Sequence, residues 1–456
     1  MNLEYYIARN VAKAGQKSFS RLIIRIAIVA VALSMVVMIV ATSLINGFQK
    51  GISSKIFGFW GHIDIIDTNV NRSFEAVPTK MNQDFYPHID TLGPMLYRAK
   101  ASFLGYEFED KMEDRKTKGG IRHIQVYAQK PGIIKVKQAV KEDPHLDDQT
   151  SGRSKKKKMV DQLEGIIIKG VGADFDWENM GDYLVKGRPI SLLDSTESKD
   201  IILSEETSRR LILDVGSKLR VHFVEGRDML ERSFKVCGIY KTGMEEFDRK
   251  FAIADIKVLQ NIYGWAPNEV GGFEVFLDDL HDLDVIRDYL YFEVLPNNLF
   301  AQTIRDKFPS IFDWLDLQDI NKIVILLLMV VVSIINMITA LMILILERTN
   351  MIGTLKALGS TDWSIRKIFL YHAFYIISLG LFFGNLIGLA FCFIQKHFEV
   401  ITLSEKDYYL SVAPIEINFW TILLLNIGTM LITLLFLIIP SYLVTRINPV
   451  EALRFK

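Results

Sequence analysis

Long apolar stretches without a charged side chain are the first feature of this sequence. Four of them cover residues 26–49, 323–346, 368–395 and 417–445. Each is longer than the roughly 20 residues that an α-helix needs to cross the hydrocarbon core of a bilayer, and buried helices of soluble proteins rarely run that far without a charge. The pattern therefore predicts four transmembrane helices.

The region between the first two stretches, residues 50–321, is polar and mixes two periodicities. Alternating or continuous apolar runs predict strands at 62–67, 219–224, 234–240 and 272–277. N-capping residues followed by helical periodicity predict helices after Ser204, Asp255 and Asp282, the second of them ending at Gly264. We therefore expect a membrane α-helical protein with four transmembrane helices plus a large α+β extracytoplasmic domain of two subdomains.

Basic side chains beside the apolar stretches predict the orientation, because Lys and Arg are retained on the cytoplasmic side. They are concentrated in residues 1–25, 347–367 and 446–456, whereas acids are in excess in the 396–416 loop. We expect both termini in the cytoplasm and residues 50–321 outside it.

The N-terminal segment 1–25 carries a basic residue at about every fourth position from Arg9. This spacing fits an interfacial helix on anionic lipid headgroups, or charges that only set the orientation. Ala30-Val31-Ala32 mimics a signal-peptide cleavage site, but the long segment before it and the long apolar stretch favour an uncleaved anchor.

The amino-acid composition narrows the classes of function that this protein could have. The 53 basic and 53 acidic side chains give a formal net charge of zero, which argues against a nucleic-acid-binding protein. The two cysteines, Cys237 and Cys392, lie in different regions, so we expect neither a disulfide nor a cysteine metal site. Residues 141–161 are too charged to bury much apolar area and predict a mobile loop, whose lysines at 155–158 could touch a partner or anionic lipid.

The sequence lacks common nucleotide-binding and catalytic motifs. The sequence has no G-x-x-x-x-G-K-[ST], no H-E-x-x-H and no G-x-S-x-G, and its eight histidines show no metal-ligand spacing. The acidic stretch 278–284 lacks the glycine and the terminal glutamate of a calcium loop, so a loop leading into a helix N-terminus explains it better. We expect no catalytic residue and no metal, so the chain is not predicted to be an enzyme.

Small and polar residues interrupt the apolar stretches. Gly380, Gly384 and Gly388 recur at four-residue spacing and predict a face that packs closely against another helix, although glycine is common in membrane spans. Four polar residues should face protein or a cavity, and interhelical hydrogen bonds are the favoured explanation over substrate contact. They are Asn336, His372, Asn385 and Asn426.

Two short amphipathic elements flank the later stretches. In the 347–367 loop, Ile352, Leu355 and Leu358 form an apolar ridge that ends at Gly359, which predicts a short helix that docks into another surface. In the tail, a helix start is predicted from a capping residue, a first-turn proline and a capping-box acid. These are Asn448, Pro449 and Glu451.

These residues resemble a known family, the permease subunits of the LolC/LolE, MacB and FtsX class of ABC systems. The resemblance covers nearly the whole chain. It rests on Asn46-Gly47-Phe48, Gly61-His62-Ile63, the ER…IGTLKALGS motif at 347–360 and INPVEALRF at 447–455. The N-terminal pattern YYIARNVAK…ISSKIFGFWGHIDI is most similar to the lipoprotein-releasing branch.

The resemblance implies a bacterial inner-membrane permease that works with an ABC ATPase on a separate chain, which binds ATP and Mg, so that this chain holds no cofactor. It implies a second permease, identical or paralogous, to form a dimer, and a periplasmic domain in two parts. It also implies a coupling helix at 352–359 that sits in a groove of the ATPase. The candidate coupling residues are Glu347, Arg348, Ile352, Gly353, Leu355, Lys356, Ala357, Leu358 and Gly359.

The lipoprotein-releasing branch implies extraction of lipoproteins from the membrane, driven by ATP hydrolysis, and their transfer to a periplasmic carrier. The charged stretch 107–161 departs from the usual pattern and is interpreted as an insertion. Alternatives are a MacB-like exporter of periplasmic cargo, an FtsX-like signalling scaffold that controls a cell-wall hydrolase, and a membrane-anchored enzyme.

Overall fold

The computed structural model describes residues 18–69, 76–88, 92–103, 106–139, 159–181, 183–192, 196–225 and 228–446. The chain divides into two compact units. The membrane unit comprises Met1–Gly51, Ser310–Leu403 and Leu410–Lys456. The sheet unit comprises Ile52–Pro309 and Ser404–Tyr409.

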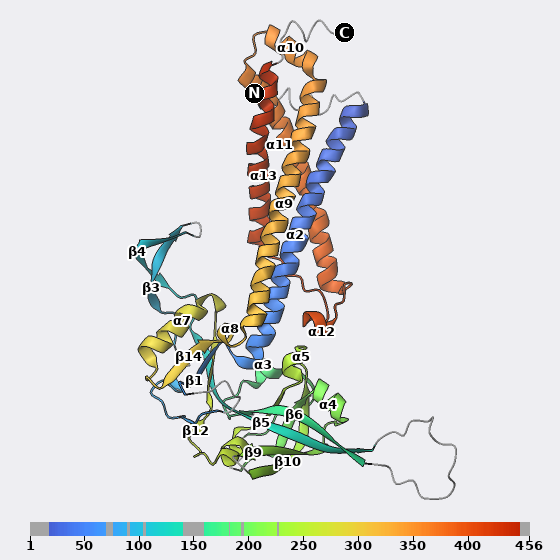
Figure 1. Ribbon diagram of the computed structural model, residues 1–456. Coiled ribbons are helices and arrows are strands. Elements are labelled where there is room, and N and C mark those ends of the chain that lie inside the picture. The colour runs from blue at the N-terminus through green and yellow to red at the C-terminus, as the bar shows by residue number, and fades with distance from the viewer. Residues whose placement is uncertain are drawn as a thin grey trace, which may run out of the picture. The chain divides into compact units, whose positions relative to one another are not determined.

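Four long helices form the membrane unit (Figure 1). They are α2 (Ser18–Trp60), α9 (Pro309–Glu347), α11 (Asp362–Phe398) and α13 (Phe419–Ser441), the last followed by the 3₁₀ turn η4 (Tyr442–Arg446). These are the four helices, among the described residues, that are long and apolar enough to cross a membrane. Each contains most of one predicted apolar stretch, but α2 continues past Lys50 to Trp60.

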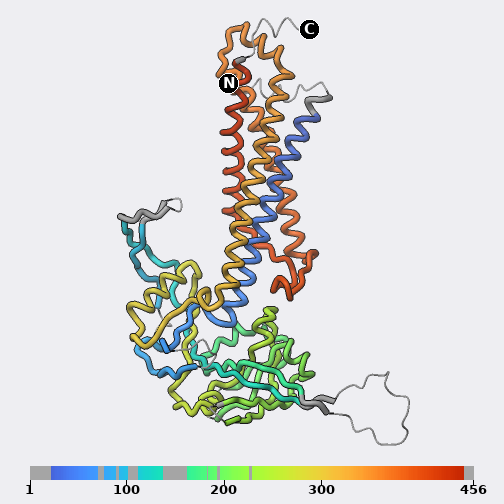
Figure 2. The backbone as a smooth tube through the Cα atoms, in the orientation of Figure 1, coloured from blue at the N-terminus to red at the C-terminus, as the bar shows by residue number. Residues whose placement is uncertain are grey.

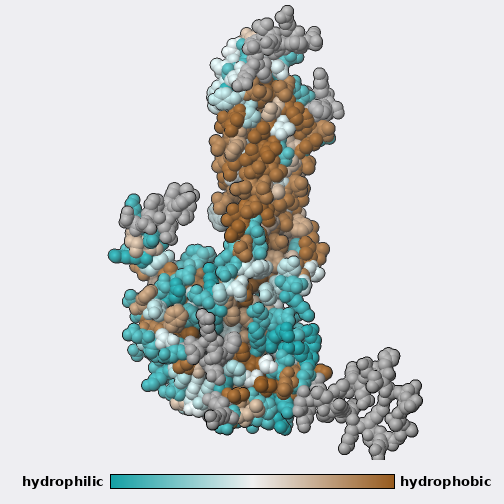
Figure 3. Space-filling model, viewed as in Figure 1, coloured by the Kyte–Doolittle hydropathy of each residue, from teal (hydrophilic) through white to brown (hydrophobic). Residues whose placement is uncertain are grey.

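The interior of the membrane unit is apolar and draws mainly on α2 and α11. Met35, Met38 and Ile39 on α2 are fully buried, as are Met337 on α9 and Ile377 on α11. The most apolar windows of α9 and α13 are buried to a smaller extent than those of α2 and α11. Figure 3 shows the resulting continuous hydrophobic surface over these helices, which suits contact with lipid or with another membrane protein.

A ten-stranded mixed sheet dominates the sheet unit, in the order β14-β1-β13-β5-β6-β11-β8-β10-β7, with β9 pairing both β10 and β5. Two two-stranded sheets, β3–β4 and β12–β2, lie off it. The main strands are β1 (Ile63–Asp67), β5 (Ile121–Ala139), β6 (Met159–Val171), β7 (Leu184–Gly187), β8 (Asp200–Ser204), β9 (Lys218–Glu225), β10 (Asp228–Tyr240), β11 (Phe251–Asp255), β13 (Gly272–Leu277) and β14 (Leu299–Thr303). The others are β2 (Thr79–Lys80), β3 (Leu96–Phe103), β4 (Tyr106–Lys116) and β12 (Glu269–Val270).

Residues from the two ends of this region meet in the sheet. β1 pairs antiparallel with β14, so residues next to α2 lie beside residues next to α9 (Figure 2). The four predicted strands are all present, within β1, β9, β10 and β13.

Short helices complete the sheet unit. They are α3 (Trp177–Gly181), α4 (Glu205–Leu211), α5 (Glu245–Asp248), α6 (Ile256–Tyr263), α7 (Leu283–Tyr289), α8 (Ile304–Lys307) and α12 (Glu405–Tyr408), with η2 (Leu280–Asp282) and η3 (Leu290–Val294). The predicted helix starts are confirmed: Ser204 and Asp255 cap α4 and α6 with their side chains, and α7 begins after Asp282. α6 ends at Gly264, whose φ of 70° lies in the left-handed region.

The interpretation of 107–161 as an insertion is wrong for residues 121–139. These residues form β5, which pairs with β13, β6 and β9 and is the most extensively bonded strand of the sheet. Residues 140–158 of the predicted mobile loop lie outside the described residues, and β6 begins at Met159.

One hydrophobic core runs along the whole sheet, from Ile63 and Ala301 at one end to Phe234 at the other. Among the described residues, the main strands join into one sheet and share this core. The division into two subdomains therefore stays a prediction.

Candidate functional site

The loop between the second and third long helices folds as predicted, into the short helix α10 (Thr349–Ala357). Its end is defined by Gly359, whose φ is 89°, and by two backbone hydrogen bonds, from Gly359 N–H to the Lys356 carbonyl (3.0 Å) and from Ser360 N–H to the Leu355 carbonyl (2.9 Å). Thr361 then caps α11 by accepting a hydrogen bond from the Ser364 N–H. α10 is therefore a separate helix that ends before α11 begins.

The apolar ridge on α10 faces in two directions. Ile352 is fully buried in the core of the membrane unit, and Gly353 is buried beside it. Leu358 is 78% exposed, and Leu355 is half-buried. Ile352 therefore anchors α10 to the bundle, and Leu358 remains available to a partner.

Lys356 ties α10 to its neighbours. Its Nζ lies 3.0 Å from the Asp362 carboxylate at the start of α11 and donates a hydrogen bond to the Thr445 carbonyl in η4 (3.2 Å). Close by in sequence, the Arg366 guanidinium stacks 3.7 Å from the Tyr442 ring centroid. These contacts fix α10, α11 and η4 as one end of the membrane unit.

The other candidate coupling residues surround this end. Glu347 is the last residue of α9, Arg348 is the half-buried residue between α9 and α10, and Ala357 is exposed. Trp363, which the sequence analysis did not single out, is 53% exposed in the first turn of α11. Asn448, Pro449 and Glu451 of the tail lie outside the described residues.

The three glycines of α11 form one buried face against α2. A Cβ on Gly380 would lie 2.7 Å from Val31, and one on Gly384 would lie 2.7 Å from the Met35 Cβ. Gly388 is next to Ile39. Since real Cβ contacts are never that short, glycine at 380 and 384 is what allows the two helices to approach so closely.

The polar residues at membrane depth are placed differently from one another. Asn385 on α11 and Asn426 on α13 exchange amide hydrogen bonds of 2.6 and 3.0 Å. Asn336 is half-buried. His372 is buried, and neither of its ring nitrogens has a hydrogen-bond partner among the described residues.

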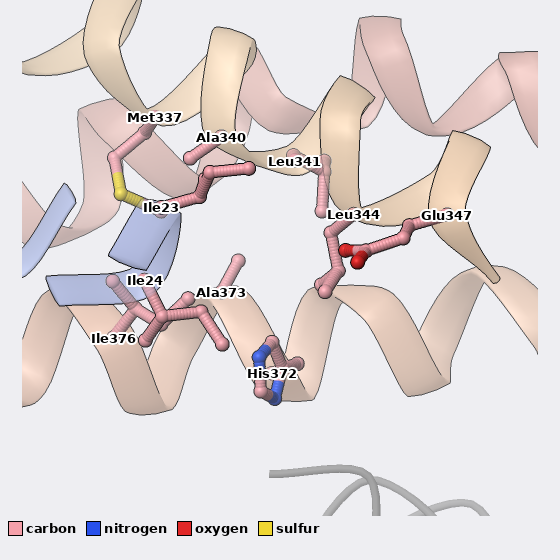
Figure 4. Close-up of a pocket in the computed structure, with 10 residues that line it drawn as sticks. All are labelled: Ile23, Ile24, Met337, Ala340, Leu341, Leu344, Glu347, His372, Ala373 and Ile376. Carbon is pink, nitrogen blue, oxygen red and sulfur yellow. The ribbon is translucent and has the colours of Figure 1, made fainter. Parts of the chain in front are cut away.

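His372 lines a small cavity between α2, α9 and α11 (Figure 4). Apolar side chains such as Ile24, Leu344 and Ile376 make up most of the lining, with Glu347 at its edge. The cavity has a volume of about 10 Å³ for the centre of a water-sized sphere, room for about one water molecule. It is too small for a lipid or a drug-sized ligand.

The Asn46-Gly47-Phe48 motif holds the opposite end of the membrane unit together. The Asn46 side-chain oxygen accepts a hydrogen bond from Lys322 of α9 (3.1 Å). A Cβ on Gly47 would lie 2.3 Å from the Pro414 carbonyl oxygen, so only glycine lets the loop before α13 come this close to α2. The Glu416 N–H donates to the Ser43 carbonyl one turn earlier on α2 (3.0 Å).

The last turn of α2 is fixed inside the sheet unit by a buried ion pair. Lys169 Nζ lies 2.7 Å from the Glu274 carboxylate and donates a hydrogen bond to the Phe59 carbonyl (2.6 Å), and both charged side chains are 1% exposed. Burial lowers the pKa of Lys169 and raises that of Glu274, and the attraction between the two opposes both shifts. The lysine also complements the negative end of the helix dipole of α2.

The acidic stretch 278–284 has the structural role predicted for it. Asp282 accepts hydrogen bonds from the Lys118 and Gly119 N–H groups, Asp278 accepts one from the Gly120 N–H, and Asp279 caps η2. Among the described residues, no group of His, Cys, Asp or Glu side chains could hold a metal ion.

Two family models match the chain. The FtsX-like permease C-terminal model matches residues 323–449, which include α10. The model of the MacB-like periplasmic core domain matches residues 26–290, more than half of the chain. The chain therefore belongs to the family that has this MacB-like periplasmic core domain. It is a permease of the LolC/LolE, MacB and FtsX class.

Curated relatives cover the whole length. The chain is 21% identical to the lipoprotein-releasing system transmembrane protein LolC of Neisseria meningitidis serogroup B over 100% of both chains. It is 21% identical to LolE of Haemophilus influenzae over 99% of both. It is 22% identical to LolC of Haemophilus influenzae over 56% of this chain and 64% of the relative, so this match spans just under two thirds of that relative's length.

Among solved structures, the extracellular domain of the noncanonic ABC-type transporter YknZ from Gram-positive bacteria aligns with 40% of this chain and 81% of its own. The identity is 11% and the TM-score is 0.24.

Proposed function

We propose that this protein is the permease subunit of an ABC transporter that extracts lipoproteins from the bacterial inner membrane for delivery to the outer membrane. The observation that carries the proposal is the full-length similarity to both LolC and LolE proteins, which by name are transmembrane proteins of a lipoprotein-releasing system. The exporter and the scaffold rest on the MacB-like and FtsX-like models alone.

ATP is hydrolysed by a separate ABC ATPase, which binds ATP and Mg, because the sequence contains no phosphate-binding loop. The ATPase docks on the end of the membrane unit that carries α10. Leu358 enters an apolar groove of the ATPase, with Trp363 beside the contact, while Ile352 and Lys356 hold the helix in place. This end faces the cytoplasm, as do both termini.

A conformational change at the ATPase-binding end is then transmitted along the helices α2 and α9. α2 runs without a break for 43 residues, or about 65 Å at 1.5 Å per residue, and the boundary between the two units falls within it. α9 makes the second connection, beginning at Pro309. An uninterrupted helix whose last turn is bonded to the buried Lys169 transmits displacement better than a flexible linker would. The sheet unit lies in the periplasm, where its two predicted subdomains respond to this displacement.

The energetics of the cargo explain why ATP is needed. Withdrawing acyl chains from a bilayer costs about 0.8 kcal/mol for each buried methylene, so three chains cost tens of kcal/mol. A second permease, identical or paralogous, covers the apolar surface that α9 and α13 leave exposed, and a periplasmic carrier accepts the released lipoprotein.

Reconstitution tests the proposal. Proteoliposomes that contain the permease, its partner permease and the cognate ATPase should release a triacylated lipoprotein to a soluble carrier when ATP is added. Release should stop without ATP or with an ATPase that cannot hydrolyse it. ATP turnover without release of any acylated cargo would contradict the proposal.

A further inference from the structure

The loop between α11 and α13 leaves the membrane unit and returns to it. Residues up to Leu403 and from Leu410 onward belong to the membrane unit, whereas Ser404–Tyr409, which contain α12, belong to the sheet unit. The chain therefore passes between the two units at this loop as well as at α2 and α9. We call residues 404–409 the strap.

Both ends of the strap are fixed in the membrane unit. Just outside it, Thr402 and Val412 form an antiparallel β-bridge. The buried Gln395 amide near the end of α11 accepts a hydrogen bond from the Ile401 N–H (2.9 Å) and donates to the Ile401 and Ala413 carbonyls (both 3.1 Å). The strap is therefore a closed loop whose base must move with α11.

Two lysines of the sheet unit hold the strap. Lys241, which follows β10, lies 2.7 Å from the Glu405 carboxylate in α12. Lys55, in the last turns of α2, donates a hydrogen bond to the Tyr409 carbonyl (2.8 Å). Gly243, whose φ is 75°, leaves room for this ammonium group, because a Cβ there would lie 2.5 Å from the Lys55 Nζ. The contact thus depends on two cations that reach the strap from different elements.

These contacts are polar and open to water. None of the four residues of α12 is buried. The side chains of Lys241 and Glu405 are 37% and 34% exposed, and a charged cleft of about 130 Å³ lies beside them. An exposed ion pair contributes little to stability, because water solvates the separated charges almost as well.

The joint at the last turn of α2 is built differently. Lys169 and Glu274 are each 1% exposed, and separating such a pair would leave uncompensated charges in the interior. The strap can therefore detach from the sheet unit while this joint stays intact.

We propose that the strap detaches reversibly, so that Lys241 and Lys55 hold it on the sheet unit in one state of the ATP cycle and release it in another. The inference rests on the proposed function, in which an ATPase drives a conformational change in the membrane unit. When α11 moves, the base of the strap moves with it, and the exposed polar contacts separate before the packed ones. The strap thereby controls whether movement of α11 reaches the sheet unit.

Crosslinking across the charged cleft tests the proposal. Glu245 on α5 and Lys406 on α12 both line the cleft, and changing the two to Cys leaves the two lysine contacts in place. In the transporter assembled with its ATPase, a short bifunctional methanethiosulfonate reagent should link the pair at rates that differ about threefold or more between the nucleotide-free and vanadate-trapped states. The native Cys237 and Cys392 are buried, and the two single-cysteine variants are the controls. Equal rates in both states would overturn the proposal, because the strap would then be a permanent brace.

Charge exchange gives a second readout in proteoliposomes. Lys241→Glu should lower the amount of lipoprotein released per ATP hydrolysed about threefold, as expected for the loss of an exposed ion pair. The exchange Lys241→Glu/Glu405→Lys should restore most of the release. Lys406→Glu, at the neighbouring exposed lysine of α12, is the matched control and should behave as the wild type does. All three should keep the wild-type melting temperature, and failure of the exchange to restore release would remove this ion pair from the coupling.

These experiments separate the inference from the proposed function, because the crosslinking rate depends on the nucleotide state and not on cargo. If the wild-type transporter releases no lipoprotein but the linking rate still changes with nucleotide, the proposed function fails and the strap remains. If release is normal while the linking rate is constant, the strap fails and the proposed function remains.

Discussion

Asn385 and Asn426 bond each other across two membrane helices, each amide donating to the other's oxygen, at 2.6 and 3.0 Å. Each NH₂ group also donates to a carbonyl of its own helix, that of Leu381 or Ile422. The pair is therefore fully satisfied, and it joins α11 to α13 in the same bundle where the glycine face of α11 joins α2.

Asn385→Leu should destabilise the membrane unit, because it leaves the Asn426 amide without its partner in an apolar setting. The expected loss is about 1 kcal/mol, in the range measured for interhelical hydrogen bonds in membranes. Thermal unfolding in detergent measures it. The double variant Asn385→Leu/Asn426→Leu should lose less than the sum of the two single variants, and strict additivity would show that the pair contributes nothing jointly.

Gly384→Leu should lower stability without changing topology. Its Cβ would lie 2.7 Å from the Met35 Cβ and 2.8 Å from the Ala32 carbonyl oxygen, so α2 and α11 must separate. Gly428→Leu on α13 is the matched control, because nothing lies within 4 Å of its missing Cβ. Equal melting temperatures for Gly384→Leu and Gly428→Leu would contradict close packing of the glycine face.

Leu358→Asp should weaken attachment of the ATPase by roughly 2–4 kcal/mol, since it places a charge in an apolar contact. Because Leu358 is 78% exposed, the permease alone should keep its stability. Ile352→Asp should instead destabilise the membrane unit, where Ile352 is fully buried. Co-purification and melting temperature distinguish the two effects, and normal ATPase stoichiometry with Leu358→Asp would exclude this residue from the docking contact.

Acid should destabilise the sheet unit through His62. Burial, and to a smaller extent the Arg122 charge, lower the pKa of His62 to about 3, and its Nδ1 accepts a hydrogen bond from the Leu277 N–H (2.6 Å). Between about 6.5 and 3 the unfolded chain binds the extra proton, so this contribution to stability is lost as pH falls below 6.5.

The expected loss from His62 between pH 7 and pH 5 is roughly 2 kcal/mol. Urea unfolding of the detergent-solubilised protein, followed by tryptophan fluorescence, measures it. His62→Asn keeps an acceptor but cannot become a cation, so its stability should fall by about that much less over the same pH range. Parallel pH profiles for the two proteins would contradict the assignment.

The orientation of the protein in the membrane is tested by cysteine labelling. Thr402 and Thr354 are both exposed, and the native Cys237 and Cys392 are buried. An impermeant maleimide should label Thr402→Cys in intact spheroplasts and should label Thr354→Cys only after lysis. Labelling of Thr354→Cys from outside would reverse the topology and remove α10 from the cytoplasm.

Structural features that depend on local sequence signals, such as helix ends, were predicted correctly from the sequence. Ser204, Asp255 and Gly264 mark helix ends because capping chemistry involves only neighbouring residues. β5 was missed because its exposed face is charged near Lys135, which made a central strand look like part of an insertion. α2 was expected to end at Gln49, but helix continues through Lys50 and Lys55, since charges end a membrane span without ending a helix.

The short helix α10 was predicted from the sequence, but the directions in which its apolar side chains point were not. Ile352, Leu355 and Leu358 share one ridge by periodicity, and only tertiary packing shows that Ile352 faces the bundle and Leu358 does not. Likewise, Asn385 and Asn426 are 41 positions apart, so their pairing could not be derived from either helix alone. Lys356, one of the candidate coupling residues, bonds within the chain to Asp362 and Thr445, which the sequence did not indicate.

The central claim is that the transporter acts on acylated cargo, and the ATPase response to acylation tests it most directly. With permeases and ATPase together in proteoliposomes, ATP turnover is measured with one lipoprotein in triacylated form and with the same protein stripped of its acyl chains. The account predicts stimulation by the acylated form only, because only that form is anchored in the bilayer. Equal stimulation by both forms, or by neither, would contradict it.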